Sequence, residues 1–294
     1  MVTTANIPNP GASAKAIQHH YDVSDEFFSL WLDPSLTYSS AIWEEGETIE
    51  DFEKAQMRKL DYHIEQAQVK GAKRVLDVGF GWGSLLKRLV DAHGVEKVVG
   101  LSLSQAHVDF VSAWGHPNIE ARLESWTEHS PEEPYDGIIS LEVFEHFARP
   151  ELTSEEKVAG YREFFRRCHE WLKPGGKISI QTIVYENARK QNSNKFLSEE
   201  VWPESDLARQ FEIFKSTDML FEILSFQNYR EHYVRTFKAW LKKLKANRAA
   251  AVNLVGEEVF ARYLKYCSLF TIAFHTGTAN VSCISMRKID NSRK

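Results

Sequence analysis

The chain has 294 residues, of which 43% are hydrophobic and 26% charged, and its formal net charge is −5 at pH 7. This composition supports a sizeable folded core, and the absence of a marked Lys/Arg cluster speaks against a nucleic-acid partner. The three cysteines are scattered, which predicts no metal site and suits a reducing, cytoplasmic location. No run of 18 apolar residues occurs, so no transmembrane segment is predicted.

The first part of the chain, residues 1–70, is predicted to form a helical, aromatic-rich cap segment. Ser24 is placed to cap a short helix, because acidic residues follow it in the first turn and a run of aromatic residues comes next. A second amphipathic helix is expected over residues 48–67. Its charged residues, Lys59 among them, are expected to form a solvated face.

Residues 71–184 alternate short apolar runs with helical segments, the pattern of βαβ units around a parallel sheet. Strands are expected at 74–80, 97–104, 135–141 and 177–186. Helices are expected between them at 84–94, 105–115 and 161–176, the last stopped by Pro-Gly-Gly. The predicted fold class is therefore α/β, with a Rossmann-like core formed by this part of the chain.

Residues 185–250 are predicted to be a helical cap insertion that encloses an acceptor. Residues 251–294 are expected to supply a C-terminal helix and a strand that closes the core sheet. The aromatic residues available to this cap, most of them expected to serve as ordinary core, are Tyr21, Phe27, Phe28, Trp31, Trp43, Trp202, Phe211, Phe214, Tyr229, Tyr233, Phe237, Trp240, Tyr263, Phe270 and Phe274.

A glycine-rich turn, LDVGFGWG, directly follows the first strand of the core. Gly79 and Gly81 permit positive φ and let the backbone pass close to a ligand, which the next helix N-terminus would also face. The spacing is G-x-G-x-G, which argues against the G-x-G-x-x-G turn of dinucleotide sites. Asp77 stands at the strand end, where a carboxylate suits a ligand carrying an ammonium group instead of a pyrophosphate.

Together with this turn, VVGLSLS, the ESW around Trp126, and EVFEHF resemble the motif series of the cyclopropane-fatty-acid synthase family of methyltransferases. HHYDVSDEFFSLWLDPSLTYSSAIW and EHYVRTFKAW are similar to its flanking motifs, so the resemblance spans residues 17–286. The family includes mycolic-acid cyclopropane synthases, bacterial lipid methyltransferases and plant alkaloid N-methyltransferases. The resemblance implies a class I methyltransferase fold that uses S-adenosylmethionine and releases S-adenosylhomocysteine.

The resemblance also implies a set of residues around the donor. Tyr38 and Ser39 would reach the methionine part, the glycine turn would follow the donor, and Trp126 would offer an indole face to the adenine. The full set of expected donor-binding residues is Tyr38, Ser39, Asp77, Gly79, Gly81, Trp82, Ser102, Leu103, Ser125, Trp126 and Leu141.

Two carboxylates three residues apart, Glu142 and Glu145, follow the apolar run GIISL with His146 beside them. That position is the carboxyl end of a strand, where open α/β sheets bind ligands. An alkene that accepts a methyl group must afterwards lose a proton, and a protonated amine must lose one before it attacks, so both acceptors need a base. We therefore expect Glu142, Glu145, His146 and Tyr233 to be catalytic, Tyr233 because it coincides with the family's site.

In the lipid-modifying branch of the family, the resemblance implies a bound bicarbonate ion as the base. Glu145 and Tyr233 match that pocket, whereas Ser40 replaces the usual Cys and Gln181 the usual His. A Gln amide can donate a hydrogen bond to an anion but cannot relay a proton. An internal base and a bound bicarbonate therefore both stand as alternatives.

The sequence predicts an enzyme that transfers a methyl carbon to an apolar acceptor, an unsaturated acyl chain or a specialised metabolite, by C-methylation or cyclopropanation. The alternative is an amine N-methyltransferase that uses Glu142, Glu145 and His146, because E-x-x-E-H also resembles the plant branch. A non-catalytic module that binds S-adenosylmethionine is a remote third. Acceptors that arrive free, at a membrane surface or on a carrier protein are all compatible with the sequence, as is any oligomeric state.

Overall fold

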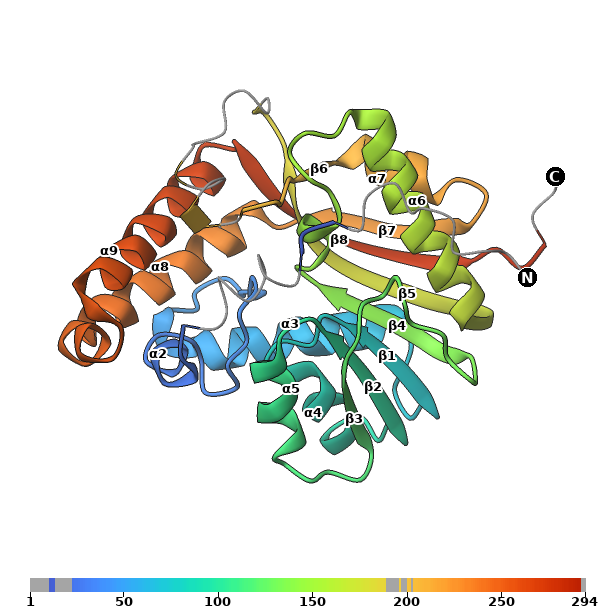
Figure 1. The fold of residues 1–294 in the computed structure, drawn as a ribbon, viewed down its shortest axis with the longest axis horizontal. Helices are drawn as coiled ribbons and strands as arrows, with labels where there is room; N and C mark the ends of the chain where they lie inside the picture. Colours follow the sequence, from blue (N-terminus) through green and yellow to red (C-terminus); the bar gives the residue numbers. More distant parts are fainter. Residues whose placement is uncertain (1–10, 14–22, 189–195, 197–199, 202, 292–294) are drawn as a thin grey trace.

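The computed structural model describes residues 11–13, 23–188, 196, 200–201 and 203–291, so Tyr21 and Trp202 lie outside the described residues. A single sheet with strand order β3-β2-β1-β4-β5-β8-β7 forms its centre, and β6 pairs with β5 off this path (Figure 1). The strands are β1 (Arg74–Val78), β2 (Lys97–Ser102), β3 (Ile119–Leu123), β4 (Tyr135–Leu141), β5 (Leu172–Tyr185), β6 (Ala208–Arg209), β7 (Phe221–Asn228) and β8 (Ala279–Lys288).

The strands β3, β2, β1, β4 and β5 run parallel, whereas β8 is antiparallel to both β5 and β7. The long register between β5 and β8 runs from Lys177 opposite Arg287 to Tyr185 opposite Ala279. Helical connections join β1 to β2, β2 to β3 and β4 to β5, whereas residues 124–134, between β3 and β4, contain no helix. The α/β, Rossmann-like fold class predicted from the sequence is confirmed.

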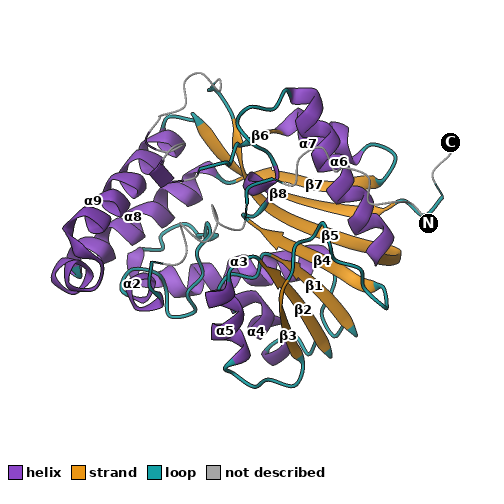
Figure 2. Cartoon of the chain, in the orientation of Figure 1, coloured by secondary structure: helices purple, strands orange, loops and turns teal. Residues whose placement is uncertain are grey.

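Helices cover both faces of the sheet (Figure 2). Successive strand residues point to opposite faces, so Val75 packs in one apolar cluster and Leu76 in another. The helices of the Val75 face are α3 (Phe52–Ala67), α4 (Ser84–Asp91) and α5 (Gln105–Ser112). The opposite face packs against α6 (Ser154–Trp171) and α7 (Gln210–Thr217).

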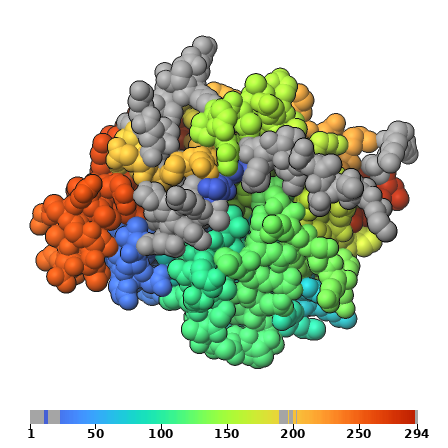
Figure 3. All heavy atoms as spheres, viewed as in Figure 1, coloured from blue at the N-terminus to red at the C-terminus, as the bar shows by residue number. Residues whose placement is uncertain are grey.

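A third apolar cluster forms the cap, in which α2 (Asp25–Ser29) packs with α8 (Arg230–Ala246) and α9 (Arg248–His275). Ser24 caps α2 as predicted, since its Oγ accepts a hydrogen bond from the Phe27 N–H at 3.2 Å. The space-filling view shows α8 and α9, in orange, beside the blue N-terminal residues at one side of the molecule (Figure 3). The cap therefore joins segments from both ends of the described chain.

Some of the aromatic residues predicted for the cap lie in the cap cluster, whereas others lie on α7 beside the sheet. Phe27, Trp31 and Trp240 are fully buried in the cap cluster. Phe211 instead lies 55% exposed on α7, and Phe214 packs against Phe226 of β7. The two α7 residues therefore belong to the sheet side of the molecule and do not line the cap.

Three secondary-structure expectations were wrong. Residues 119–123 and 221–228 form the edge strands β3 and β7, which the sequence analysis assigned to no strand, the second within a segment expected to be helical. The strand expected at 177–186 begins earlier, as β5 at Leu172, and includes the Pro-Gly-Gly segment, so the preceding helix ends at Trp171. Gly175 adopts a φ of +70°, which glycine permits within this irregular start of the strand.

Among the helices of the described residues, none has an apolar stretch long enough to cross a bilayer. The 3-10 helices are η1 (Ile49–Asp51), which opens α3, and η2 (Phe144–Phe147), which follows β4. The second of these carries the carboxylate and imidazole singled out from the sequence.

Candidate active site

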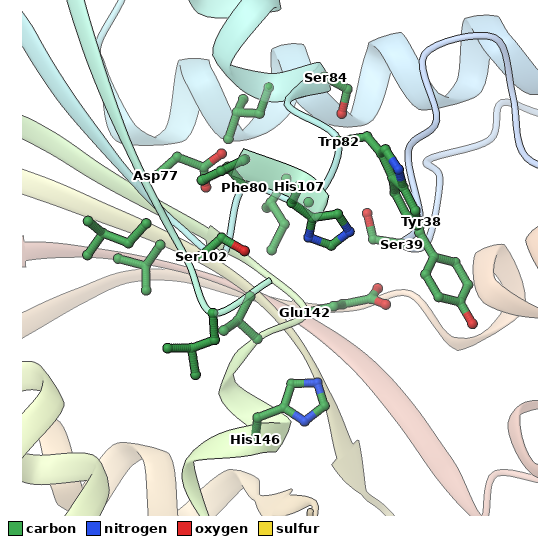
Figure 4. A pocket seen from close by; sticks show the side chains of 18 of the residues that line it. Tyr38, Ser39, Asp77, Phe80, Trp82, Ser84, Ser102, His107, Glu142 and His146 are labelled. Carbon is green, nitrogen blue, oxygen red and sulfur yellow. The ribbon is translucent and has the colours of Figure 1, made fainter. Parts of the chain in front are cut away.

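A cavity opens at the carboxyl ends of the parallel strands, between the sheet and the N-terminal segment (Figure 4). Every one of the predicted donor-binding residues lines it. So do Glu142 and His146, whereas Glu145 and Tyr233 do not. The parallel strands converge there because their carboxyl ends share one edge of the sheet, so turns distant in sequence meet.

The glycine turn forms one wall of this cavity. Gly79 and Gly81 have φ values of +84° and +54°, and Gly83, at +82°, precedes α4. A Cβ on Gly79 would lie 2.0 Å from Cγ2 of Val143, so no other residue fits that position without displacement. The backbone thereby passes close to the cavity, with the first turn of α4 directly behind it.

We expect Gly79→Ala to lower the free energy of unfolding by about 2 kcal/mol, because it combines a left-handed backbone with an overpacked Cβ. Urea denaturation would measure this. The matched control is Gly81→Ala, whose Cβ meets nothing within 4 Å, so it has the backbone strain alone. Equal midpoints for the two variants would contradict the predicted contact with Val143.

The carboxylate of Asp77 lines the cavity. The residue is buried, and its Oδ1 has no hydrogen-bond partner among the described residues. Burial raises the pKa of this carboxyl to about 8, an effect that the Lys59 charge partly opposes. An acceptor atom of this kind fits the ammonium group of S-adenosylmethionine, which would supply the missing donor and favour the ionised carboxylate.

Lys59 does not lie on the solvated helix face that was predicted from the sequence, so that prediction was wrong. Its side chain is fully buried, lines the cavity and donates a hydrogen bond from Nζ to Ser39 Oγ at 2.6 Å. Burial lowers the pKa of this ammonium to about 8, although the nearby Glu142 and Asp33 charges raise it. The amphipathic pattern alone gave no sign of this, because Ser39, to which Lys59 donates, belongs to another segment of the chain.

Aromatic side chains line the cavity near the glycine turn. The Trp82 ring lies 4.6 Å from that of His107 and 4.7 Å from that of Phe28, and Trp82 Nε1 donates to Asp25 Oδ1 at 2.8 Å. Burial lowers the pKa of His107 to about 4, so its imidazole is neutral at pH 7. Trp82 thus fixes the cap against the turn.

Trp126 follows β3, lines the cavity and packs edge-on to Phe164 at 5.4 Å. Ser125, beside it, exchanges a hydrogen bond with Thr127 at 2.8 Å. The cavity also includes His107, Ser84 and Glu124, which the sequence analysis did not select as donor-binding residues. Ser84 and Glu124 follow a strand closely, a signal too common to identify a site.

Glu142 lies at the centre of a hydrogen-bond network. The Ser40 N–H donates to its Oε1 at 2.9 Å, and Gln181 Nε2 donates to the same oxygen at 2.6 Å. The Tyr233 hydroxyl donates to Oε2 at 2.5 Å. Burial raises the pKa of Glu142, against the effect of these three hydrogen bonds and of Lys59. Four segments of the chain therefore meet at one carboxylate.

Glu145 is directed toward the backbone of β5. Its Oε1 accepts a hydrogen bond from the Ile183 N–H, and its Oε2 is buried without a hydrogen-bond partner among the described residues. Burial, and then the charge of Glu142, raise the pKa of this carboxyl to about 8. At neutral pH Glu145 is therefore mainly protonated.

His146 faces the cavity from η2, and its Nδ1 lies 2.8 Å from Ser205 Oγ. Burial lowers the pKa of the imidazole to about 4, so the ring is neutral at pH 7. The residues predicted as catalytic thus fall into two groups. Glu142 and His146 line the cavity, Tyr233 reaches it through Glu142, and Glu145 lies behind them.

The sheet order and the cavity at the strand ends define a class I methyltransferase fold. The Mycolic acid cyclopropane synthetase family matches residues 9–284. The S-adenosylmethionine-dependent methyltransferase UmaA of Mycobacterium tuberculosis is 30% identical over 290 residues, which cover 92% of this chain and 96% of UmaA. Hydroxymycolate synthase MmaA4 of the same organism is 33% identical over 275 residues, 85% of this chain and 84% of MmaA4.

Among solved structures, mycolic acid cyclopropane synthase CmaA1 complexed with S-adenosylhomocysteine (SAH) and CTAB is 29% identical. It aligns with a TM-score of 0.83 over 95% of this chain and 99% of CmaA1. The chain therefore belongs to the mycolic acid cyclopropane synthetase family and is an S-adenosylmethionine-dependent methyltransferase. The resemblance found in the sequence, and the donor it implied, are confirmed.

Proposed function

We propose that this enzyme methylates a nucleophilic carbon of an apolar acceptor, giving a C-methyl or a cyclopropane product. The observation on which this proposal depends is that the carboxylates of Asp77 and Glu142 line the same cavity (Figure 4). Membership of the family supports an acyl-like acceptor, as does the similar structure that was solved with SAH and the detergent CTAB.

In this proposal the donor is held by the cavity residues named from the sequence. Asp77 accepts a hydrogen bond from the donor ammonium, and Ser39, fixed by Lys59, lies beside the methionine part. The glycine turn allows close approach, and Trp126 packs against the adenine. The donor supplies an already activated methyl group, so the protein mainly has to aim the acceptor, exclude water and accept a proton.

We assign four side chains to the acceptor side. Glu142 is the proton acceptor, and Tyr233 orients it through its hydroxyl. Glu145 positions the β5 backbone at Ile183 through the hydrogen bond that its Oε1 accepts. His146 contributes a neutral imidazole to the cavity wall beside the acceptor.

A second candidate function is amine N-methylation. It is favoured by Glu142 and the neutral His146 lining the same cavity, because a carboxylate binds an ammonium acceptor and an imidazole can take its proton. The two functions differ in the acceptor atom that gains the methyl group. They can therefore be separated by the chemistry of the product.

We also propose a cytoplasmic enzyme that meets its acceptor free, at a membrane surface or on a carrier protein. The cysteines Cys168, Cys267 and Cys283 are all buried and unpaired, as suits a reducing compartment.

The proposed function is tested with methyl-labelled S-adenosylmethionine and three acceptors: dioleoyl phosphatidylglycerol vesicles, the saturated distearoyl vesicles as control, and tetrahydroisoquinoline as an amine. We expect label in the oleoyl chains, with a mass gain of one CH2 unit, and none in the saturated chains. Label in the amine alone would support the second candidate. Equal label in saturated and unsaturated lipid would contradict attack by an alkene carbon.

A further inference from the structure

The carboxylate of Glu142 fills a site that is built to hold an anion. Three donors from separate segments converge on it: a backbone N–H at Ser40, an amide at Gln181 and a hydroxyl at Tyr233. These are three of the four residues that the sequence analysis assigned to an external bicarbonate ion. A Glu carboxylate and a bicarbonate ion each present two oxygen atoms in a plane, so the same set of hydrogen-bond donors can bind either group.

The amide of Gln181 is oriented to serve an anion. Its Oε1 lies 3.1 Å from His63 Nε2, and an amide oxygen only accepts, so His63 donates from Nε2. Burial lowers the pKa of His63 to about 3, so this ring is neutral, and its Nδ1 accepts from the Ser179 hydroxyl at 2.8 Å. With its oxygen held in this way, Gln181 turns its NH2 group to Glu142.

The backbone at Glu142 adopts a φ of +55°, in the left-handed region that favours glycine. A glutamate held there, with both carboxylate oxygens bound, is typical of a functional position. The buried Lys59 ammonium and the three hydrogen bonds favour the ionised form of Glu142, against the effect of burial, which raises its pKa.

We propose that Glu142 is a built-in replacement for an external anion: its carboxylate occupies the anion pocket and removes the proton that the acceptor releases, so that turnover requires no bicarbonate. This inference rests on the proposed function, in which Glu142 is the proton acceptor, and adds that its carboxylate takes the place of an external ion. In the step, the acceptor carbon forms a bond to the methyl carbon while the sulfur–carbon bond breaks. The resulting carbocation then loses a proton to Glu142, and the electron pair of that C–H bond closes the cyclopropane ring or forms a new double bond. The Glu142 carboxylic acid returns the proton to water after product release.

The first test measures anion binding and needs no acceptor. Carbon-13-labelled bicarbonate is titrated, in the presence of SAH, into the wild-type enzyme and the variants Glu142→Gly and Glu142→Gln, with binding read from carbon-13 line broadening. We expect binding to Glu142→Gly only, because glycine vacates the pocket whereas the isosteric amide of Gln fills it. Glycine also suits the positive φ, so this variant should fold, and calorimetric SAH binding verifies its site.

Two results would overturn the inference: wild-type enzyme that binds bicarbonate as tightly as Glu142→Gly, or a Glu142→Gly variant that binds SAH but no bicarbonate. Either result leaves the proposed function intact, because neither measurement involves the acceptor. Conversely, if the wild-type enzyme transferred no methyl group to the oleoyl acceptor, this result would count against the proposed function. The inference about the anion pocket would still be tested by the bicarbonate binding measurement.

The second test measures turnover with the oleoyl acceptor in carbonate-depleted buffer. The wild-type rate should be unchanged by added bicarbonate. Glu142→Gly should be about 100-fold slower without it and recover about 10-fold with it, as expected for loss and partial replacement of a general base. Glu142→Gln should stay slow in both buffers. Stimulation of the wild-type enzyme by bicarbonate, or a Glu142→Gln variant at the wild-type rate, would refute the inference.

Discussion

Asp77→Asn should weaken the binding of S-adenosylmethionine by about 100-fold, or roughly 3 kcal/mol, the upper range for a hydrogen bond to a charged group. The Asp77 carboxyl is buried on the cavity floor, and its Oδ1 has no partner among the described residues until a ligand supplies one. Asparagine keeps the shape of the side chain but removes the negative charge. Isothermal titration calorimetry with S-adenosylmethionine and with SAH measures the change.

The matched ligand control is methylthioadenosine, which shares the nucleoside and sulfur of the donor but lacks its amino-acid tail. Its affinity should be the same for the wild-type enzyme and Asp77→Asn. An equal loss of affinity for both ligands would show that Asp77 supports the fold of the cavity instead of binding the ammonium.

The same substitution should stabilise the unliganded protein at pH 7 and above. The pKa of Asp77 is raised by burial from 3.8 to about 8, so the folded protein holds this proton more tightly than the unfolded chain. The residue therefore opposes folding increasingly as the pH rises between these two values. A higher melting temperature for Asp77→Asn without ligand, together with weaker donor binding, distinguishes a functional carboxylate from a structural one.

Trp240→Ala should lower the free energy of unfolding by about 3–5 kcal/mol, as for other large truncations in a packed core. Trp240 is fully buried in the cap, and its ring lies 5.7 Å from Trp31, 5.2 Å from Tyr38 and 4.8 Å from Phe237. Because Tyr38 also lines the cavity, we expect weaker donor binding as well. Urea denaturation measures the first effect and calorimetry the second.

Two variants serve as controls for Trp240→Ala. Trp114→Ala removes an indole that is 36% exposed and should cost much less stability. Trp240→Phe keeps an aromatic ring and removes an indole N–H that is buried without a partner among the described residues, so it should recover a large part of the lost stability. If Trp114→Ala and Trp240→Ala unfolded at the same urea concentration, the cap would not be a cooperative part of the core.

The central strands could be predicted from sequence because they are buried on both faces and appear as continuous apolar runs, as in β1 and β2. The edge strands could not. IEARL in β3 has only five residues, FEILSFQN in β7 breaks its alternation at Ile223 and Leu224, where the pairing with β8 is irregular, and most side chains of both strands are partly or fully exposed. Their assignment depends on the neighbour with which each pairs, which short-range patterns do not reveal.

Those cavity residues that lie in local motifs could be predicted from the sequence, such as the glycine turn after β1 and Asp77 before it. The acceptor side depends on contacts between distant segments. Ser40, Gln181 and Tyr233 were selected by resemblance as ligands of an external ion, and only the fold shows that Glu142 receives their hydrogen bonds. Lys59 was wrongly predicted to be solvated for the same reason, because its hydrogen-bond partner Ser39 belongs to another segment.

The position of β8 between β5 and β7 has a consequence for how the chain is made. During synthesis β7 emerges from the ribosome before α8 and α9, and its ladder partner β8 follows only after them. Until then the β7 edge has no strand beside it, and such unpaired edges favour association between nascent chains. Closure of the sheet is therefore a late event in the folding of this enzyme.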